Sequence, residues 1–130
     1  NYARALSRFT VQALKGANIT VYGDGTQTRS FCYITDTTLG ILLALTSERS
    51  KGEVFNIGSS DERTILQLAG IVKQTVGSRS QIVFESLPLD DPERRCPDIS
   101  KAAHVLKWSP QVTLENGLPR TIDWFRKAMP

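Results

Sequence analysis

Two arginines in a proline-marked segment are the first residues of this chain whose type and spacing suggest binding chemistry. The segment from Asp90 to Asp98 reads DDPERRCPD, so that carboxylates flank Arg94 and Arg95. Guanidinium groups bind phosphate oxygens in a bidentate manner, and a loop fixed by prolines is a suitable place to hold one. The segment therefore indicates either an anion-binding loop or a solvated loop with local ion pairs, each contributing about 0–1 kcal/mol.

A second candidate segment, YGDGTQTRSF, runs from Tyr22 to Phe31 and contains a glycine-rich turn followed by Arg29. Its spacing is neither that of GxGxxG nor that of a Walker A motif. An aromatic ring can stack on a base, contributing about 1–3 kcal/mol, while an arginine contacts a phosphate. The alternative interpretation is an ordinary connection between two strands.

The remaining reactive side chains indicate no catalytic or metal site. His104, the only histidine, falls on an alanine-rich stretch and is interpreted as a surface or packing residue. Asp90 and Asp91 are adjacent, and adjacent side chains usually diverge, which disfavours an acid–base pair. Cys32 and Cys96 form no CxxC or zinc spacing. They are predicted to be free thiols in a reducing compartment, which indicates the cytoplasm.

Composition favours one globular domain that binds neither membranes nor nucleic acids. The 130 residues are 40% hydrophobic and 22% charged. The longest apolar run, Ile41 to Leu45, is far shorter than the roughly 20 residues that cross a bilayer. The net charge of +3 permits an anionic ligand, but no run of Lys and Arg exceeds two residues. Nucleic acid is therefore not an expected partner.

The elements that must position these residues follow from periodicity, capping signals and turns. Amphipathic spacing predicts five helices: near 2–15, from Thr35 or Asp36 onward, 65–76, from Asp98 or Ser100 onward, and 113–127. Short β-type runs predict four strands, at 19–22, 30–34, 52–58 and 81–84, and the prolines of 88–97 predict a loop. The mixed order predicts an α/β or α+β fold whose strands belong to a larger sheet.

Local signals add detail to three of these helices. Thr64 and Gln67 form an expected capping box, and Gly77 closes that helix. Pro119 should kink the last helix or delay its regular part. The apolar stripes predict the buried faces, which are Leu6, Phe9 and Ala13; Leu39, Leu42 and Leu43; Ile65, Leu68, Ala69, Val72 and Val76; and Leu114, Leu118, Ile122 and Phe125.

Four motifs together resemble a known family over nearly the whole chain. They are TVYGDGTQTRSFCYITD from Thr20, VFNIG from Val54, DDPERRCPDISKA from Asp90 and LKWSPQVTLENGL from Leu106. The chain resembles the C-terminal, substrate-binding portion of extended Rossmann-type short-chain dehydrogenases/reductases, the NAD-dependent nucleotide-sugar epimerase/dehydratase family. The DDPERRCPD form is most similar to UDP-glucuronate decarboxylases. UDP-glucose 4-epimerases and dTDP-glucose 4,6-dehydratases are close alternatives.

The resemblance implies that the chain binds a UDP-sugar or a related nucleotide sugar. The implied contacts are Arg29 and Arg95 with the diphosphate, Tyr22 beside the pyrimidine ring, the backbone of Thr20 and Val21 at its edge, Asp98 near the ribose, and Arg4. The match at Arg4 is the weakest, because the flanking residues differ from the family segment.

The resemblance also implies that catalysis needs residues found outside these 130. The family binds NAD through GxxGxxG and reacts through a YxxxK pair. None of Tyr2, Tyr22 and Tyr33 has a lysine four residues later, and Gly23 and Gly25 do not follow the dinucleotide spacing. We therefore expect residues 1–130 to be a nucleotide-sugar-binding domain that is inactive alone and that was cut from a longer enzyme carrying the NAD-binding part.

A different class of function stays open beside this one. A truncated or stand-alone chain could act as a non-catalytic association module. Its surface would then include an apolar patch where the absent dinucleotide-binding half packs in the family, and that patch would promote oligomerisation.

Overall fold

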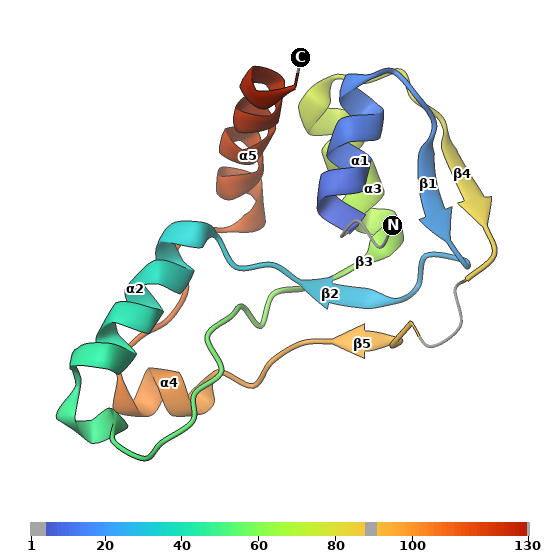
Figure 1. The fold of residues 1–130 in the computed structure, drawn as a ribbon. Helices are drawn as coiled ribbons and strands as arrows, with labels where there is room; N and C mark the ends of the chain where they lie inside the picture. Colours follow the sequence, from blue (N-terminus) through green and yellow to red (C-terminus); the bar gives the residue numbers. More distant parts are fainter. Residues whose placement is uncertain (1–4, 88–90, 130) are drawn as a thin grey trace. The chain divides into compact units, whose positions relative to one another are not determined.

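Residues 5–87 and 91–129 are described by the computed structural model of this chain (Figure 1). The chain divides into two units, each described here by itself. The first unit comprises Asn1–Thr28, Arg63–Arg94 and Leu118–Pro130, and the second comprises Arg29–Glu62 and Arg95–Gly117. No helix within the described ranges is long and apolar enough to cross a membrane.

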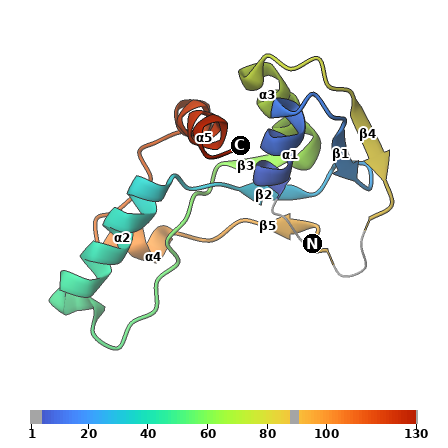
Figure 2. The ribbon, with the colours of Figure 1, turned by 45° about the horizontal axis from the view of Figure 1, so that its top comes forward.

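A pair of parallel strands forms the sheet of the first unit. β1 (Ile19–Tyr22) pairs with β4 (Ile82–Glu85) in a register that runs from Ile19 opposite Ile82 to Tyr22 opposite Glu85. α1 (Ala5–Leu14) and α3 (Ile65–Val76) lie side by side next to this pair, as Figures 1 and 2 both show. Parallel strands need such a covering layer because their faces are apolar.

The core of the first unit confirms most of the predicted apolar stripes. α3 begins with the expected capping box, in which the side chains of Thr64 and Gln67 each accept from the other residue's backbone N–H. Gly77 ends α3 in the left-handed conformation, with φ at 72°. The buried side chains of this core are Phe9, Thr10, Ala13, Ile19, Val21, Ile65, Leu68, Ala69, Val72, Leu118 and Ile122.

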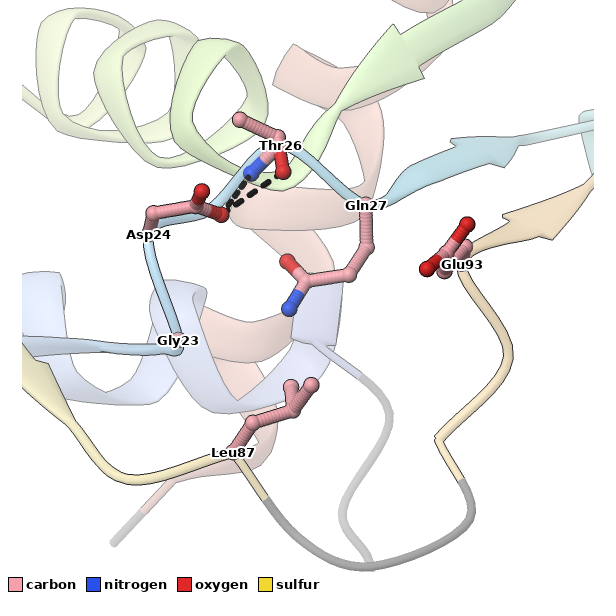
Figure 3. A pocket seen from close by; sticks show the side chains of 6 residues that line it. All are labelled: Gly23, Asp24, Thr26, Gln27, Leu87 and Glu93. Atoms are coloured by element: carbon pink, nitrogen blue, oxygen red, sulfur yellow. Dashed lines mark hydrogen bonds between the residues drawn. The ribbon is translucent and has the colours of Figure 1, made fainter.

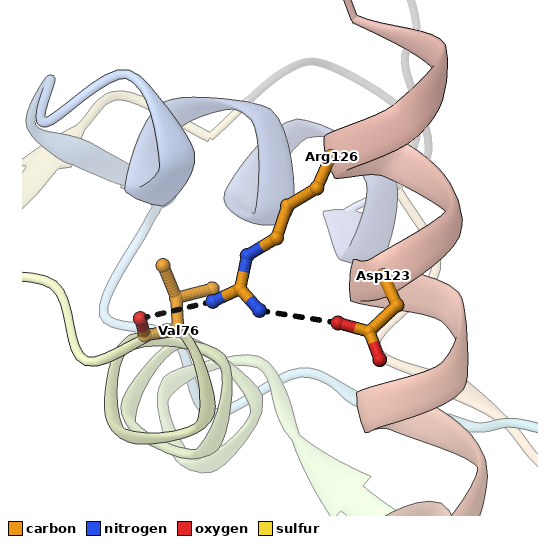
Figure 4. Close-up of polar contacts among 3 residues, drawn as sticks. All are labelled: Val76, Asp123 and Arg126. Atoms are coloured by element: carbon orange, nitrogen blue, oxygen red, sulfur yellow. Dashed lines mark hydrogen bonds and ion pairs between the residues drawn. The ribbon is translucent and has the colours of Figure 1, made fainter.

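α5 (Leu114–Ala128) supplies the last two of these core residues and runs as one helix through Pro119. The last turn of α5 carries Arg126, whose guanidinium lies 3.1 Å from an Asp123 carboxylate oxygen (Figure 4). Arg126 also donates to the backbone oxygen of Val76 at the end of α3. A cation placed at the C-terminus of a helix is favoured by the helix dipole, so this contact stabilises the approach of α5 to α3.

The second unit is built around Trp108. α2 (Ile34–Thr46) is followed by a 3₁₀ turn, η1 (Glu48–Ser50), and α4 (Ser100–Val105) lies beside α2 in both ribbon views (Figures 1 and 2). Trp108 is buried, and its indole N–H donates to the backbone oxygen of Asp36. Trp108 forms a buried cluster, the Trp108 cluster, with Ala102 and Leu106. The partly buried side chains packed against this cluster are Cys32, Leu43, Ala44, Phe55, Ile57, Ile99 and Val105.

The expected apolar stripe of α2 is wrong at Leu39 and Leu42, whereas Leu43 is partly buried against the Trp108 cluster. The buried positions of α2 are Asp36 and Gly40, whereas Leu39 and Leu42 are about half exposed. Gly40 faces Ile57 and Trp108 so closely that an added Cβ would meet them at 2.7 and 3.0 Å. A small residue and a hydrogen-bonded carboxylate therefore turn inward, and most of the large aliphatic side chains turn outward.

Three short strands form a second sheet, and they correct two sequence-based expectations. β2 (Thr28–Ser30), β3 (Glu62–Thr64) and β5 (Arg94–Arg95) pair in the order β3-β2-β5, with the division between the units falling inside each strand. The predicted strand 30–34 is wrong, because β2 ends at Ser30 and α2 starts at Ile34. The predicted 88–97 loop contains β5, while residues 88–90 lie outside the described residues.

The predicted strand 52–58 is also wrong. No residue of this segment is assigned to a strand, and Val54 is 81% exposed. β-branched and aromatic residues favour a strand only where another strand pairs with them, and the described residues supply no partner here. Within residues 5–87 and 91–129, the prediction of five helices is confirmed, and five strands stand in place of the predicted four.

Candidate functional site

The edge of β1 that faces away from β4 is occupied by side chains of α1. The backbone N–H of Thr20 donates to the Gln12 side-chain oxygen at 3.1 Å, and Gln12 in turn donates to the Thr20 hydroxyl at 3.0 Å. The backbone oxygen of Thr20 accepts from the Arg8 guanidinium at 2.9 Å. The family resemblance implies that the backbone of Thr20 and Val21 contacts the edge of a pyrimidine. In this structure the backbone of Thr20 is hydrogen-bonded to α1, and the side chain of Val21 is buried in the core.

Arg8 also covers part of Tyr22, which the sequence interpretation did not foresee. Its guanidinium carbon lies 4.2 Å from the centroid of the Tyr22 ring, a cation–π contact. Its Nε atom is buried without a hydrogen-bond partner. Arg8 and Gln12 are four residues apart on α1, and this helical spacing, which places both on one face, is the signal that could have revealed the pair.

A cavity of about 530 Å³ lies where β1 and β4 end, entirely within the first unit. We call it the acceptor pocket. Its lining is shown in Figure 3 and consists of Gly23, Asp24, Thr26, Gln27, Leu87 and Glu93. Both strands run toward it, since Gly23 directly follows β1 and Leu87 follows β4 by two residues.

Gln27 is the most buried polar side chain of the acceptor pocket, with 6% of its surface exposed. Its amide nitrogen donates to the Tyr22 backbone oxygen at 3.2 Å, whereas its amide oxygen is buried and has no hydrogen-bond partner. Gly23, at φ 63°, packs against the amide so closely that a Cβ would lie 2.8 Å from Nε2. A buried acceptor without a hydrogen-bond partner therefore lies in a fixed position beside the pocket.

Two carboxylates border the same pocket. One oxygen of Asp24 accepts from both the backbone N–H and the hydroxyl of Thr26, at 2.9 and 2.7 Å. These hydrogen bonds, above all that from the hydroxyl, lower the pKa of the exposed Asp24 carboxyl. Glu93 lies across the pocket from Asp24 (Figure 3). The electrostatic character of the pocket is therefore negative.

Close packing requires a glycine at position 25 in the turn after β1. Gly25 has a φ of 76°, and an added Cβ would lie 2.8 Å from the Val21 side chain and 3.0 Å from that of Leu66. This glycine is needed so that the turn can pack on its own strand and helix.

The second unit brings two of the predicted arginines onto neighbouring strands. Arg29 is on β2 and is half-buried, while Arg95 is on β5 and is exposed. The Ser30 hydroxyl lies 3.4 Å from the Arg95 backbone oxygen. Both arrows point the same way in Figure 1, so the two guanidinium-bearing residues leave adjacent strands of one sheet.

Asp98 follows this strand pair in the same unit. One of its carboxylate oxygens accepts from the Ser100 backbone N–H at 2.9 Å at the start of α4, and hydrogen bonds from Ser100 lower the pKa of Asp98. Its backbone oxygen accepts from the Asn56 side chain at 3.0 Å. Asp98 is exposed and can contact a ligand while it fixes the start of the helix.

The predicted site residues thus fall into two groups. Thr20, Val21 and Tyr22 lie on β1 in the first unit, and Arg29, Arg95 and Asp98 lie in the second; Arg4 is outside the described residues. His104 is exposed on α4, as predicted, and both cysteines are free thiols.

Comparison with known proteins confirms the family resemblance. Residues 1–58 match the NAD dependent epimerase/dehydratase family. The chain is 46% identical over 129 residues to UDP-glucuronic acid decarboxylase 1 of Xenopus tropicalis, covering 99% of this chain and 30% of the relative. This chain therefore spans about a third of the length of the curated relatives it matches.

Solved structures show the same fold. UDP-glucose 4-epimerase of Thermotoga maritima, solved with UDP-glucose, matches with a TM-score of 0.91 and 32% identity over 100% of this chain and 41% of its own. UDP-glucuronic acid 4-epimerase of Bacillus cereus, solved with UDP-glucuronic acid and NAD, matches with a TM-score of 0.89 and 34% identity. That alignment covers 95% of this chain and 40% of the epimerase.

Proposed function

We propose, from the premise that this chain carries part of an NAD-dependent epimerase/dehydratase family domain, that it is the nucleotide-sugar-binding portion of a UDP-glucuronate decarboxylase-like enzyme. The assignment to the decarboxylase branch is supported by 46% identity to the Xenopus tropicalis decarboxylase along nearly the whole chain. The ligand class is a UDP-sugar, which the epimerases of similar fold bind.

The observation that carries this proposal is the placement of Arg29 and Arg95 on adjacent strands of the second unit. A diphosphate offers several oxygens along a short chain, and two guanidinium groups can each bind it in a bidentate manner. Their positions within the QTR and RCPD motifs agree with the roles that the family resemblance implies. Tyr22 stays the predicted neighbour of the base.

We assign the redox chemistry to the part of the enzyme outside these 130 residues. NAD is named with the Bacillus cereus epimerase, whereas Gly23 and Gly25 of this chain depart from the GxxGxxG spacing of the family. A polypeptide partner surface is supported by the exposed aliphatic face of the second unit, which would be covered in the longer enzyme. Its members are Ile34, Leu39, Ile41, Leu42, Leu45 and Val54.

Two alternatives are tested with the main proposal. A UDP-glucose 4-epimerase or dTDP-glucose 4,6-dehydratase fragment would use the same arginines, and both enzymes are among the solved structures of similar fold. A non-catalytic association module would use only the exposed face of α2, which is the specific observation in its favour. The module is distinguished from the other two by whether the arginines bind a nucleotide diphosphate.

The test is a titration of the 130-residue chain with UDP, followed by amide NMR, for the native sequence, Arg29→Ala and Arg95→Ala. Arg49→Ala is the matched control, because Arg49 is an exposed arginine of the second unit on η1. Two charge-assisted contacts must overcome the entropy of association, so we expect a Kd of about 0.1–1 mM. Each site variant should lose the shifts and the control should keep them.

Three other results would contradict parts of this proposal. Shifts that survive in both site variants would remove the arginines from the site. Dispersed peaks without any UDP response would favour the association module. A complex in the low micromolar range would show that the chain holds more of the binding site than two arginines and one ring.

A further inference from the structure

We propose that Arg8 is a positioning residue for nucleobase binding, because its guanidinium holds the ring of Tyr22 in the orientation on which a base can stack. The inference rests on the proposed nucleotide-sugar function and deepens it, since the contacts that the family resemblance implies do not include Arg8. Arg8 and Tyr22 both belong to the first unit, on α1 and at the end of β1.

The Arg8 guanidinium is held in a defined place by its neighbours. One of its terminal nitrogens donates to the Thr20 backbone oxygen at 2.9 Å. The same group lies 5.5 Å from the centroid of the ring of Phe9, which is fully buried. Thr20 is itself fixed by Gln12, which bonds to its backbone N–H at 3.1 Å and to its hydroxyl at 3.0 Å. These contacts remove much of the rotamer freedom of a long side chain, so the fold determines where the guanidinium lies.

Tyr22 is the closer of the two aromatic neighbours of Arg8. The guanidinium carbon lies 4.2 Å from the centroid of the Tyr22 ring, compared with 5.5 Å for Phe9. A guanidinium over the face of an aromatic ring within about 6 Å is attracted by the electrons of that face. Tyr22 is the last residue of β1 and directly precedes the turn that begins at Gly23. The contact with Arg8 therefore fixes a ring at the point where the strand ends.

A ring that is already ordered binds a base more tightly than a mobile one. Tyr22 is half-buried, so part of its ring is accessible to a ligand. Stacking of a base on an aromatic side chain favours binding, whereas ordering that side chain at the moment of binding weakens affinity. Because Arg8 holds the ring before the ligand arrives, the stack forms without this ordering cost. Arg8 thus acts on the base through Tyr22.

The ligand side of the test compares UDP with inorganic pyrophosphate. Each is titrated into the 130-residue chain and followed by amide NMR; both offer a diphosphate to Arg29 and Arg95, whereas only UDP carries a base. Arg8→Met removes the guanidinium and keeps a long side chain. We expect this variant to bind UDP about fivefold more weakly and pyrophosphate as the native chain does. Arg79→Met is the matched control, because Arg79 is an exposed arginine of the same unit, and it should change neither affinity.

Two further variants test whether Arg8 acts through Tyr22. Tyr22→Leu removes the ring and should weaken UDP binding about tenfold. In that background Arg8→Met should cause no further loss, since two residues that act as one unit are not additive. Arg8→Lys keeps a cation that can lie over the ring, so its affinity for UDP should stay within about twofold of the native value.

The native chain supplies a measurement that does not depend on how a variant folds. The Nε atom of Arg8 is buried, so its proton is protected from exchange and gives an NMR signal. UDP should shift this signal, and pyrophosphate should leave it in place. If Arg8→Met unfolds the chain, this comparison decides the question.

Four results would overturn the proposal: equal weakening of UDP and pyrophosphate binding in Arg8→Met, tighter UDP binding in Arg8→Met, a loss from Arg8→Met that persists beside Tyr22→Leu, or an Arg8 signal that UDP does not shift. The first indicates a purely structural role, and the second shows that Arg8 occupies the place of the base. UDP binding that requires Arg29 and Arg95 but not Arg8 overturns this inference alone. A UDP response that survives both Arg29→Ala and Arg95→Ala contradicts the proposed nucleotide site instead.

Discussion

Asp24 shows how one turn residue can set the charge at the mouth of the acceptor pocket. Its carboxylate is held by two hydrogen bonds from Thr26, of which the hydroxyl bond is the larger cause of its lowered pKa. Folding therefore favours the ionised form. The stabilising contribution is complete above the ordinary value of 3.8 and is lost as the pH falls below 3.8 through the folded pKa.

Thr26→Val should raise the pKa of Asp24 toward 3.8, because it removes the hydroxyl donor and leaves the backbone donor in place. The measurement is a carboxyl-carbon NMR titration of Asp24 between pH 2 and 6. Thr46→Val is the control, since its hydroxyl bonds to Leu42 on α2 in the other unit. A pKa that is equal in the native chain and Thr26→Val would show that the turn does not stabilise the charge.

Sequence motifs name candidate residues, whereas contacts between side chains come only from the structure. The QTR and RCPD patterns single out Arg29 and Arg95, whose role in binding stays a prediction. The position of Arg8 could not be found in the same way, because its contact with Tyr22 joins a helix to a strand through a turn of unknown geometry. The orphaned oxygen of Gln27 is likewise defined by the absence of a neighbour, which a sequence does not record.

At the scale of elements, α2 is held by a carboxylate in its first turn. One oxygen of the buried Asp36 accepts from the backbone N–H groups of Gln111 and Val112, at 2.9 and 2.8 Å. The helix is thereby joined to the segment between α4 and α5 within the second unit. Apolar burial contributes less at this helix than elsewhere, because most of its large side chains face outward.

Asp36→Ala should lower the free energy of unfolding by about 3 kcal/mol, because two backbone donors lose a charged acceptor in a buried position. Asp36→Asn, which keeps one acceptor oxygen, should lower the free energy of unfolding by less. Urea unfolding monitored by circular dichroism measures both. Asp123→Ala is the matched control, an exposed aspartate in an ion pair, and should change stability by only about 0–1 kcal/mol. A loss in Asp36→Ala no larger than the control would contradict this account.

The elements that local chemistry determines were predicted well, and those that depend on distant partners were not. α3 matches its prediction from capping box to closing glycine, since every signal lies within the helix or next to it. The segment 52–58 has the composition of a strand but is not assigned to one. A strand forms only where a second strand pairs with it, and the composition of the segment does not reveal whether that partner is present. β5 was missed for the opposite reason, since two charged residues become a strand only by lying beside β2.

At the scale of the whole molecule, the exposed aliphatic face of α2 is unfavourable in water unless other polypeptide covers it. Leu45 is 77% exposed and Leu42 is 52% exposed on α2, and Val54, in a segment that is not assigned to a strand, is 81% exposed. Several exposed aliphatic side chains on one helix favour an interaction surface there. Relatives about three times longer than this chain supply the polypeptide that our proposal places there.

Leu45→Glu should therefore reduce self-association of the isolated chain without lowering its stability, since the side chain already contacts water. Sedimentation velocity over a range of concentrations measures the first effect, and urea unfolding measures the second. Leu68→Glu is the contrasting variant, because Leu68 is fully buried in the first unit and a charge there should unfold it.

In an enzyme extended by its dinucleotide-binding part, the same Leu45→Glu should instead lower the free energy of unfolding, because the exposed face of α2 is then covered. An unchanged stability in the extended enzyme would mean that something other than that part packs against α2.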